Sequence, residues 1–335
     1  MFTFWKPMAA FAGACFMATT ALGADMTELR FAVQTPPQIH YNKELFIPWA
    51  EKVAADSQGT LSVKMFFAGT LGKEGQLIDV VESGAADIAL DVTGYYSGRF
   101  KLTEVASLPL LVQDSESASK ALWSLYEKGL FGKEFDGLKV LAITTVPGGT
   151  LLTVDKPIQQ PSDLAGMKLA AGGQVKGEMV AAVDAAPVEV KIAELYQALS
   201  RHLVDGAMTY YTGFAPFKLH EVGKHALDVP LGGSMLLVFM SQDKFDSLPP
   251  EAQKAIEMNS GAQFSADFGA VWDRAQDAGR QMLLNAGGKI TEPSTEDMAK
   301  WQAVFSPIND AWASSVDGGP EALKGLREEL GITTN

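Results

Sequence analysis

The stretch from Pro157 to Tyr211 restricts the fold of this chain more than any other part, because short apolar runs alternate there with helical segments. Parallel strands need a crossover helix between them, so this alternation indicates a parallel sheet in an α/β fold. The expected elements are a strand at 167–171, a helix at 176–186 that ends before Pro187, a second short strand, a helix at 193–201 and a strand at 203–208.

Ligand-binding residues are expected at the ends of these strands. In open α/β sheets, ligands bind beyond the carboxyl ends of the strands. Those ends carry Ala170-Ala171-Gly172-Gly173 and Thr209-Tyr210-Tyr211 in this chain. A glycine pair after a strand allows the chain to turn and also lets the backbone approach a ligand closely. The sequence therefore predicts a binding site built from strand ends.

Two sets of strands and helices, one before and one after residue 147, predict two α/β domains. A long helix is expected at 262–285, with Phe268, Trp272 and Gly279 on one face. The remaining expected strands are 29–33, 61–67, 87–90, 138–145 and 235–240. The remaining expected helices are 42–55, 74–82, one after Asp114 that carries Leu122, Leu125 and Tyr126, 214–225, one that begins at Pro249, 295–316 and 321–330.

The first residues indicate export. Lys6 is followed by an apolar run from Met8 to Leu22 and then by small residues, which is the pattern of a secretory signal peptide within residues 1–24. The run is short for the alternative, a membrane anchor. The single cysteine, Cys15, lies inside this segment, so the mature chain is expected to hold no disulfide. Lipoprotein processing at Cys15 is the second possibility.

The net charge of the chain limits the classes of partner that it can bind. The chain carries a net charge of −13, and removal of residues 1–24, which contain one lysine and no acid, makes it −14. Such a balance argues against nucleic acid and anionic membrane surfaces as partners. It leaves small anionic ligands open, because local groups recognise them.

The motifs of catalysis are missing from the sequence. The glycine pairs match neither the dinucleotide-binding nor the P-loop pattern, and no serine lies in a nucleophile elbow. The histidines lack the spacing of zinc ligands. We therefore expect no catalytic residues, no metal and no cofactor. The four histidines are His40, His202, His220 and His225.

Three separated motifs resemble the substrate-binding proteins of TRAP transporters, the DctP family. They are GRFKLTEVASLPLL at 98–111, DLAGMKL at 163–169 and AELYQALSRHLVDGAM at 193–208. The resemblance implies a two-domain periplasmic binding protein of the Venus-flytrap type, with a hinge and a long helix that spans both domains. It further implies a monomer that captures a small organic solute and delivers it to a TRAP-type membrane permease.

The resemblance also implies the domain boundaries. Domain I would comprise residues 25–146 with about 234–260, and domain II residues 147–233 with about 287–320. The long helix, at about 261–286, would connect them.

The candidate site departs from the pattern of the family. An arginine usually follows the Gly-Met-Lys-Leu type of run and binds a ligand carboxylate through two hydrogen bonds, but Ala170 holds that position here. A second arginine of some members is matched by Thr150. The ligand-binding residues that we predict are Gln34, Thr93, Tyr95, Thr150, Ala170, Gly172, Ile192, Thr209, Tyr210 and Tyr211.

These neutral and aromatic groups suit a neutral, aromatic or cationic solute. Asp91 and the tyrosine rings could hold a cationic one. The alternative is an acid that is bound in another way. In the last case Arg99 or Lys168 would supply the charge. Two further functions remain open. They are an exported enzyme of hydrolase type and a binding protein that reports to a sensor.

Overall fold

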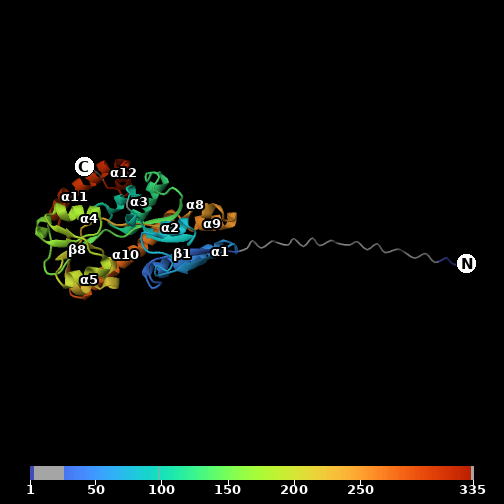
Figure 1. Ribbon diagram of the computed structural model, residues 1–335, viewed down its shortest axis with the longest axis horizontal. Helices are drawn as coiled ribbons and strands as arrows, with labels where there is room; N and C mark the ends of the chain where they lie inside the picture. The colour runs from blue at the N-terminus through green and yellow to red at the C-terminus, as the bar shows by residue number, and fades with distance from the viewer. Residues whose placement is uncertain (4–25, 97, 333–335) are drawn as a thin grey trace.

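The computed structural model describes residues 1–3, 26–96 and 98–332 (Figure 1). The expected signal segment and Cys15 lie outside the described residues. Two sheets organise the rest of the chain, one toward each end of the molecule.

The first sheet, sheet A, has the strand order β2-β1-β3-β10-β4. Strand β1 pairs in parallel with β2 and β3, whereas β10 runs antiparallel to both β3 and β4. The bounds are β1 Thr27–Ala32, β2 Leu61–Phe66, β3 Ile88–Val92, β4 Leu138–Thr145 and β10 Met235–Ser241. Strand β10 is an unbroken apolar run because it lies between two strands and is buried on both faces.

Helices cover both faces of sheet A, and the side chains of the strands alternate between two cores. Phe31 and Leu90 face the core under α1, α9 and α10 (Ala262–Asn285), while Ala89 and Phe239 face the core under α2 and α3. The helices of this unit are η1 Asn42–Phe46, α1 Ile47–Asp56, α2 Leu77–Glu82, η2 Thr93–Tyr95, η3 Leu102–Ser107, α3 Ser115–Glu127, α8 Gln242–Asp246 and α9 Pro250–Met258.

The second sheet, sheet B, has the order β11-β9-β5-β8-β6-β7. Strand β6 pairs in parallel with β7 and β8, as the alternation of strands and helices predicts, and β5 is antiparallel to β8 and β9. The strands are β5 Thr150–Thr153, β6 Lys168–Ala170, β7 Ala186–Val188, β8 Gly206–Thr209, β9 His225–Leu227 and β11 Lys289–Thr291. The helices are η4 Pro161–Leu164, α4 Gln174–Ala182, α5 Ile192–Ser200, η5 Tyr211–Gly213, α6 Phe214–Phe217 and α7 Leu219–Val222.

Two adjacent segments of backbone connect the sheets. One leads from β4 to β5 and the other from β9 to β10. They are hydrogen-bonded to each other, from Val146 N to Ser234 O at 3.1 Å and from Gly149 N to Gly232 O at 3.1 Å. Glycine is required here because a Cβ at Gly232 would lie 2.0 Å from the carbonyl oxygen of Ser107. The paired segments form a narrow junction about which the two units meet.

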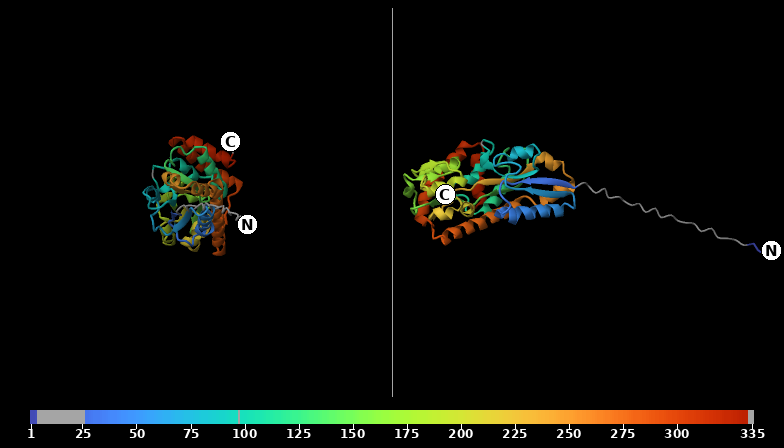
Figure 2. Two further views of the ribbon diagram at one scale, coloured as in Figure 1. Left: turned by 90° about the vertical axis from the view of Figure 1, so that its right-hand side faces the viewer. Right: turned by 60° about the horizontal axis from the view of Figure 1, so that its bottom comes forward.

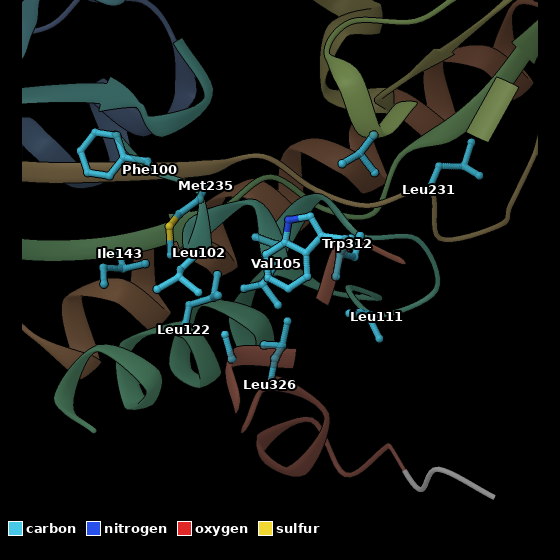
Figure 3. Packing of buried hydrophobic residues seen from close by; sticks show 14 of the residues in the cluster. Phe100, Leu102, Val105, Leu111, Leu122, Ile143, Leu231, Met235, Trp312 and Leu326 are labelled. Atoms are coloured by element: carbon cyan, nitrogen blue, oxygen red, sulfur yellow. The ribbon is translucent and has the colours of Figure 1, made fainter. Parts of the chain in front are cut away.

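Long helices also join the two units. Helix α10, Ala262–Asn285, packs against α3 and β4 of the first unit and against η5 and α6 of the second, and Figure 2 shows it running along both. Helix α11, Thr295–Ser315, contacts α4, and α12, Gly319–Glu329, returns to α3. Asn309 of α11 donates a hydrogen bond to Pro109 O at 3.0 Å. The core between α11 and the first unit includes Trp312, Val105 and Leu111 (Figure 3).

Some expected elements differ from the structure. The helix expected at 214–225 is broken because Lys218 adopts a left-handed conformation with φ of 55°, and His225 begins strand β9 instead. The short strands β5, β9 and β11 and helix α8 were not predicted. Helix α4 ends at Ala182, and Pro187 lies in the edge strand β7, where its missing N–H is tolerated.

Candidate ligand-binding cleft

The predicted residues of the first unit follow the carboxyl ends of β1 and β3. Gln34 donates its side-chain amide to Leu90 O at 2.7 Å, so it joins the ends of these two strands. Thr93 is buried and its hydroxyl donates to Met235 O at 3.3 Å. Tyr95, two residues further on, is 54% exposed. Of the three, Tyr95 offers the most surface to a solute.

Asp91 is already occupied by protein donors. Its carboxylate accepts hydrogen bonds from the amides of Gly75 at 3.0 Å and Leu77 at 3.3 Å, and from the hydroxyl of Tyr96 at 2.5 Å. Burial raises the pKa of Asp91, against the lowering effect of these bonds. This arrangement leaves little of the carboxylate for a cationic solute.

Several predicted residues of the second unit lie inside the protein. Thr150 donates its hydroxyl to Leu227 O at 2.8 Å, and Ala170 belongs to the core under sheet B. Tyr211 is 1% exposed, and its hydroxyl donates to Asp228 Oδ1 at 2.6 Å. Asp228 also pairs with Arg280 of α10. Tyr211 thereby fixes the end of β8 to the long helix.

Three further predicted residues of the second unit lie at the ends of its strands and helices. Gly172, two residues after the end of β6, is exposed, and Ile192, the first residue of α5, is 42% exposed. Thr209 is 3% exposed, and its hydroxyl has no hydrogen-bond partner among the described residues. A buried hydroxyl without a partner is uncommon in proteins, which makes Thr209 available to a bound molecule.

Tyr210 stands at the junction of the two units. It follows β8, packs partly against the core of sheet A, and its hydroxyl lies 3.2 Å from Gly233 O and 3.3 Å from Ser234 Oγ on the segment that leads to β10. The pKa of Tyr95 is raised to about 12, first by burial of its hydroxyl, then by Glu74 and Asp91, with a contribution from Tyr210. The two tyrosines come from different units, since Tyr95 follows β3 of sheet A and Tyr210 follows β8 of sheet B.

Lys176 is the residue that the sequence analysis missed. It lies in the first turn of α4, is 8% exposed, and its ammonium donates to the Tyr210 hydroxyl and lies 4.1 Å from the centroid of that ring. One signal was present in the sequence, since a lysine in the first turn of a helix opposes the helix dipole. The cations considered from sequence lie elsewhere. Arg99 pairs with Glu82 at 3.3 Å, and Lys168 is exposed at the amino end of β6.

A cavity of ≈ 620 Å³ lies between the segment after β3, helix α4 and helix α11. Its lining combines Tyr96 and Phe100 of the first unit with Glu178 of α4 and Trp312 of α11. Glu104 lines the same cavity. Burial raises its pKa, and the carboxylate of Glu178 adds to the effect. Lys101 also lines the cavity, so the interface between the units contains open space with aromatic walls and charged groups of both signs.

Metal and membrane features are not found in the described parts of the chain. Within 1–3, 26–96 and 98–332, no group of three or more His, Cys, Asp or Glu side chains could hold a metal ion. None of the helices in those ranges is sufficiently long and apolar to cross a bilayer.

Two α/β units joined by paired segments and shared helices, with solute-sized space between them, form the architecture of a two-domain solute-binding protein. The chain belongs to the bacterial extracellular solute-binding protein family 7, DctP, whose sequence model matches residues 31–315. Proteins of this family are periplasmic.

Relatives and solved structures agree with this assignment. The chain is 28% identical over 302 residues, 88% of each sequence, to the outer membrane transporter protein TsaT of Comamonas testosteroni. It is 24% identical to the C4-dicarboxylate-binding periplasmic protein DctP of Rhodobacter capsulatus, with 81% of each sequence covered.

Two crystal structures have closely similar folds. One is a marine metagenome TRAP solute-binding protein specific for aromatic acid ligands, in complex with 3-hydroxybenzoate, with 30% identity, a TM-score of 0.83 and coverage of 91% of this chain and 98% of that one. The other is a TRAP solute-binding protein of Rhodoferax ferrireducens in complex with copurified benzoate, with 26% identity, a TM-score of 0.82 and the same coverage.

Proposed function

We propose that this protein is exported by its N-terminal segment, captures a small aromatic carboxylic acid between its two units and delivers it to a TRAP-type membrane permease. The observation that carries the proposal is the buried ammonium of Lys176, which donates to Tyr210 where β8 meets the segment that leads to sheet A. Aromatic faces hold a ring, and a cation favours an acid over an amine.

The similar structures support this ligand class. Proteins of 30% and 26% identity bind 3-hydroxybenzoate and benzoate, and a protein from Bordetella bronchiseptica of 25% identity binds mandelate. The cationic alternative is less well supported, because Asp91 is satisfied by protein donors and Lys176 would repel an amine.

The capture mechanism that we propose is hinge closure. Domain I would comprise residues 25–146 with about 234–260, which include all strands of sheet A, and domain II residues 147–233 with about 287–320. A solute that contacts both domains only when they are closed shifts the population toward the closed state. Helix α11 contacts both units, so the C-terminal boundary of domain II is the least sharp.

The proposal is tested by thermal shift and calorimetry on the mature protein. We expect strong stabilisation by benzoate, 3-hydroxybenzoate or mandelate, and much weaker stabilisation by benzamide, benzylamine, succinate and glucuronate. The bound compound should be recovered unchanged, as judged by mass spectrometry. Stabilisation by dicarboxylates or amines alone would contradict the ligand class, and chemical turnover would point to an enzyme.

Delivery to a permease is tested in cells. Uptake of the labelled acid should require both this protein and a TRAP permease. If the acid binds but uptake is independent of the protein, while a sensor responds to its ligand-bound form, the protein serves signalling instead of transport.

A further inference from the structure

Lys176 is a buried charge without a countercharge. Its side chain belongs to a residue that is 8% exposed, and no carboxylate in the described residues lies within ion-pair distance of it. Removing an ammonium from water costs free energy unless hydrogen bonds and an opposite charge compensate. Other lysines without a carboxylate partner, such as Lys168, are exposed to water, whereas Lys176 is buried.

The hydrogen bonds of this ammonium are also incomplete. An ammonium has three N–H donors. Tyr210 accepts one of them, and the described residues supply no acceptor for the other two. The ring of Tyr210 contributes a cation–π contact, which is weaker than a charged acceptor. Two donors therefore remain for a molecule that enters the site.

The position of Lys176 in its helix adds to the local positive potential. Helix α4 has nine residues and begins at Gln174, and Gly173 before it offers no side chain to cap the free N–H groups of the first turn. Those groups and the helix dipole favour an anion at this end. A lysine in the same turn is unfavourable in isolation and favourable once an anion is bound.

The location is that of a solute site in an open α/β sheet. Strand β6 leads through Gly172 and Gly173 into α4, and its parallel neighbour β8 leads into Tyr210. Lys176 and Tyr210 therefore lie at the carboxyl edge of sheet B. The hydroxyl of Tyr210 also reaches Gly233 and Ser234, on the segment that continues into sheet A.

We propose that Lys176 and Tyr210 form the anion-binding pair of this protein and select solutes with a carboxylate. The ammonium donates one of its two free N–H groups to a carboxylate oxygen, and the tyrosine hydroxyl turns from Gly233 O to donate to the same carboxylate. The first-turn amides of α4 lie at the same edge. This inference rests on the proposed capture of a small acid and explains how a chain with Ala170 and Thr150 at the positions of two arginines can still bind one.

The test measures how the wild type and variants distinguish an acid from its neutral analogue. Dissociation constants for benzoate and benzamide are determined by calorimetry for the wild type, Lys176→Met, Lys176→Arg and Tyr210→Phe. Lys176→Met keeps the length of the side chain and removes its charge. We expect it to weaken benzoate binding about 10- to 100-fold and to leave benzamide binding unchanged. Lys176→Arg should retain most of the preference for the acid.

Two controls separate recognition from folding. Lys168→Met removes an exposed lysine at the opposite end of β6 and should change neither constant. The ligand-free Lys176→Met protein should be at least as stable as the wild type, because it no longer buries an uncompensated charge. A loss of ligand-free stability together with equal losses for both ligands would assign Lys176 a structural role and overturn the pair.

The outcomes also separate this inference from the proposed function. If the wild type binds benzoate-type acids and Lys176→Met binds them equally well, the pair is refuted and solute capture stands. If the wild type binds none of a panel of aromatic, aliphatic and sugar acids, capture of an acid is refuted and the pair is refuted with it.

Discussion

His40 is a partly buried histidine outside the proposed site, and its environment disfavours the charged form of its ring. Its ring packs edge-on against Tyr41 and Trp272, with centroids 5.2 and 5.0 Å away, and its Nε2 has no partner among the described residues. Burial lowers its pKa to about 4, while Glu44 opposes the effect and Arg274 adds to it. The native state therefore holds this ring neutral.

Stability should fall in mildly acidic solution for this reason. The unfolded chain takes up a proton on His40 near pH 6.5, whereas the folded protein does so only near pH 4. Between these values the unfolded state binds more protons, so the free energy of unfolding decreases as pH falls, by up to about 3 kcal/mol from this group. In urea unfolding, His40→Phe, which keeps an aromatic ring, should be more stable than the wild type at pH 5 by a larger margin than at pH 7.5.

Other buried groups also change the pH dependence of stability, so a matched variant is needed. Asp91, Glu134 and Asp273 have pKa values raised by burial, and they favour the folded state as pH falls. These groups are common to all variants and cancel in the comparison. Phe264→Leu, in the same core and without a titrating side chain, should show the same margin relative to the wild type at both pH values. If the stability difference between His40→Phe and the wild type is also the same at both pH values, His40 is not the source of the loss of stability in acid.

At the scale of single elements, α10 depends on two small residues to lie close to both units. A Cβ at Gly269 would be 2.4 Å from Ser115 O, and one at Gly279 would be 2.0 Å from Tyr211 O. Both distances are far below van der Waals contact, so the helix can sit in this position only with glycine there. Phe268 and Trp272, on the same helix, fill the core of the first unit.

Replacing Gly279 should therefore destabilise the protein although alanine is the better helix former. We expect Gly279→Ala to lower the free energy of unfolding by about 1–3 kcal/mol, since the helix or the end of β8 must move. Gly177→Ala in α4 meets nothing within 4 Å and should stabilise by up to about 1 kcal/mol. Urea unfolding of both variants checks the prediction, and a stabilised Gly279→Ala would mean that α10 does not press on Tyr211.

The elements that sequence predicts well are those with long patterns or clear ends. Helix α10 at 262–285 and strand β4 at 138–145 coincide with the expected ranges, because each is long enough to show its hydrophobic period. Strands β5, β9 and β11 have only three or four residues, which is too short for alternation to be recognised. Their pairing is decided by partners distant in the sequence.

The candidate site was less predictable than the fold. The resemblance indicated which strand ends to examine, and Tyr210 was among the residues chosen. Lys176 was not, because a lysine in a helix of small residues resembles an ordinary exposed side chain. Only the packing of α4 against the end of β8 buries it beside the tyrosine. The signal left in the sequence, its position in the first turn, is weak by itself.

At the scale of the whole molecule, the junction suits rotation of the two units. The two segments that cross it are hydrogen-bonded to each other between Val146 and Ser234 and between Gly149 and Gly232, and each contains a glycine pair. Helix α10 continues across the same junction and limits the rotation to one that keeps its contacts with both units. A hinge of a few residues flanked by a stiff helix permits closure without unfolding either sheet.

Closure can be followed by fluorescence energy transfer, because the chain after residue 24 contains no cysteine and accepts a labelled pair cleanly. Dyes at Glu51→Cys in α1 and Gln197→Cys in α5 report on the distance between the units, and both positions are exposed. We expect saturating benzoate to shift this pair toward higher transfer efficiency in the wild type, since the solute binds most tightly when both units contact it. With Lys176→Met the shift should need at least tenfold more benzoate, because this variant removes a charged interaction that stabilises the closed state.

A pair within one unit, Glu51→Cys with Lys254→Cys of α9, should not respond. Saturation without any change in the first pair would show that the acid binds to a rigid molecule, and an equal change in both pairs would trace the signal to the dyes instead of the hinge.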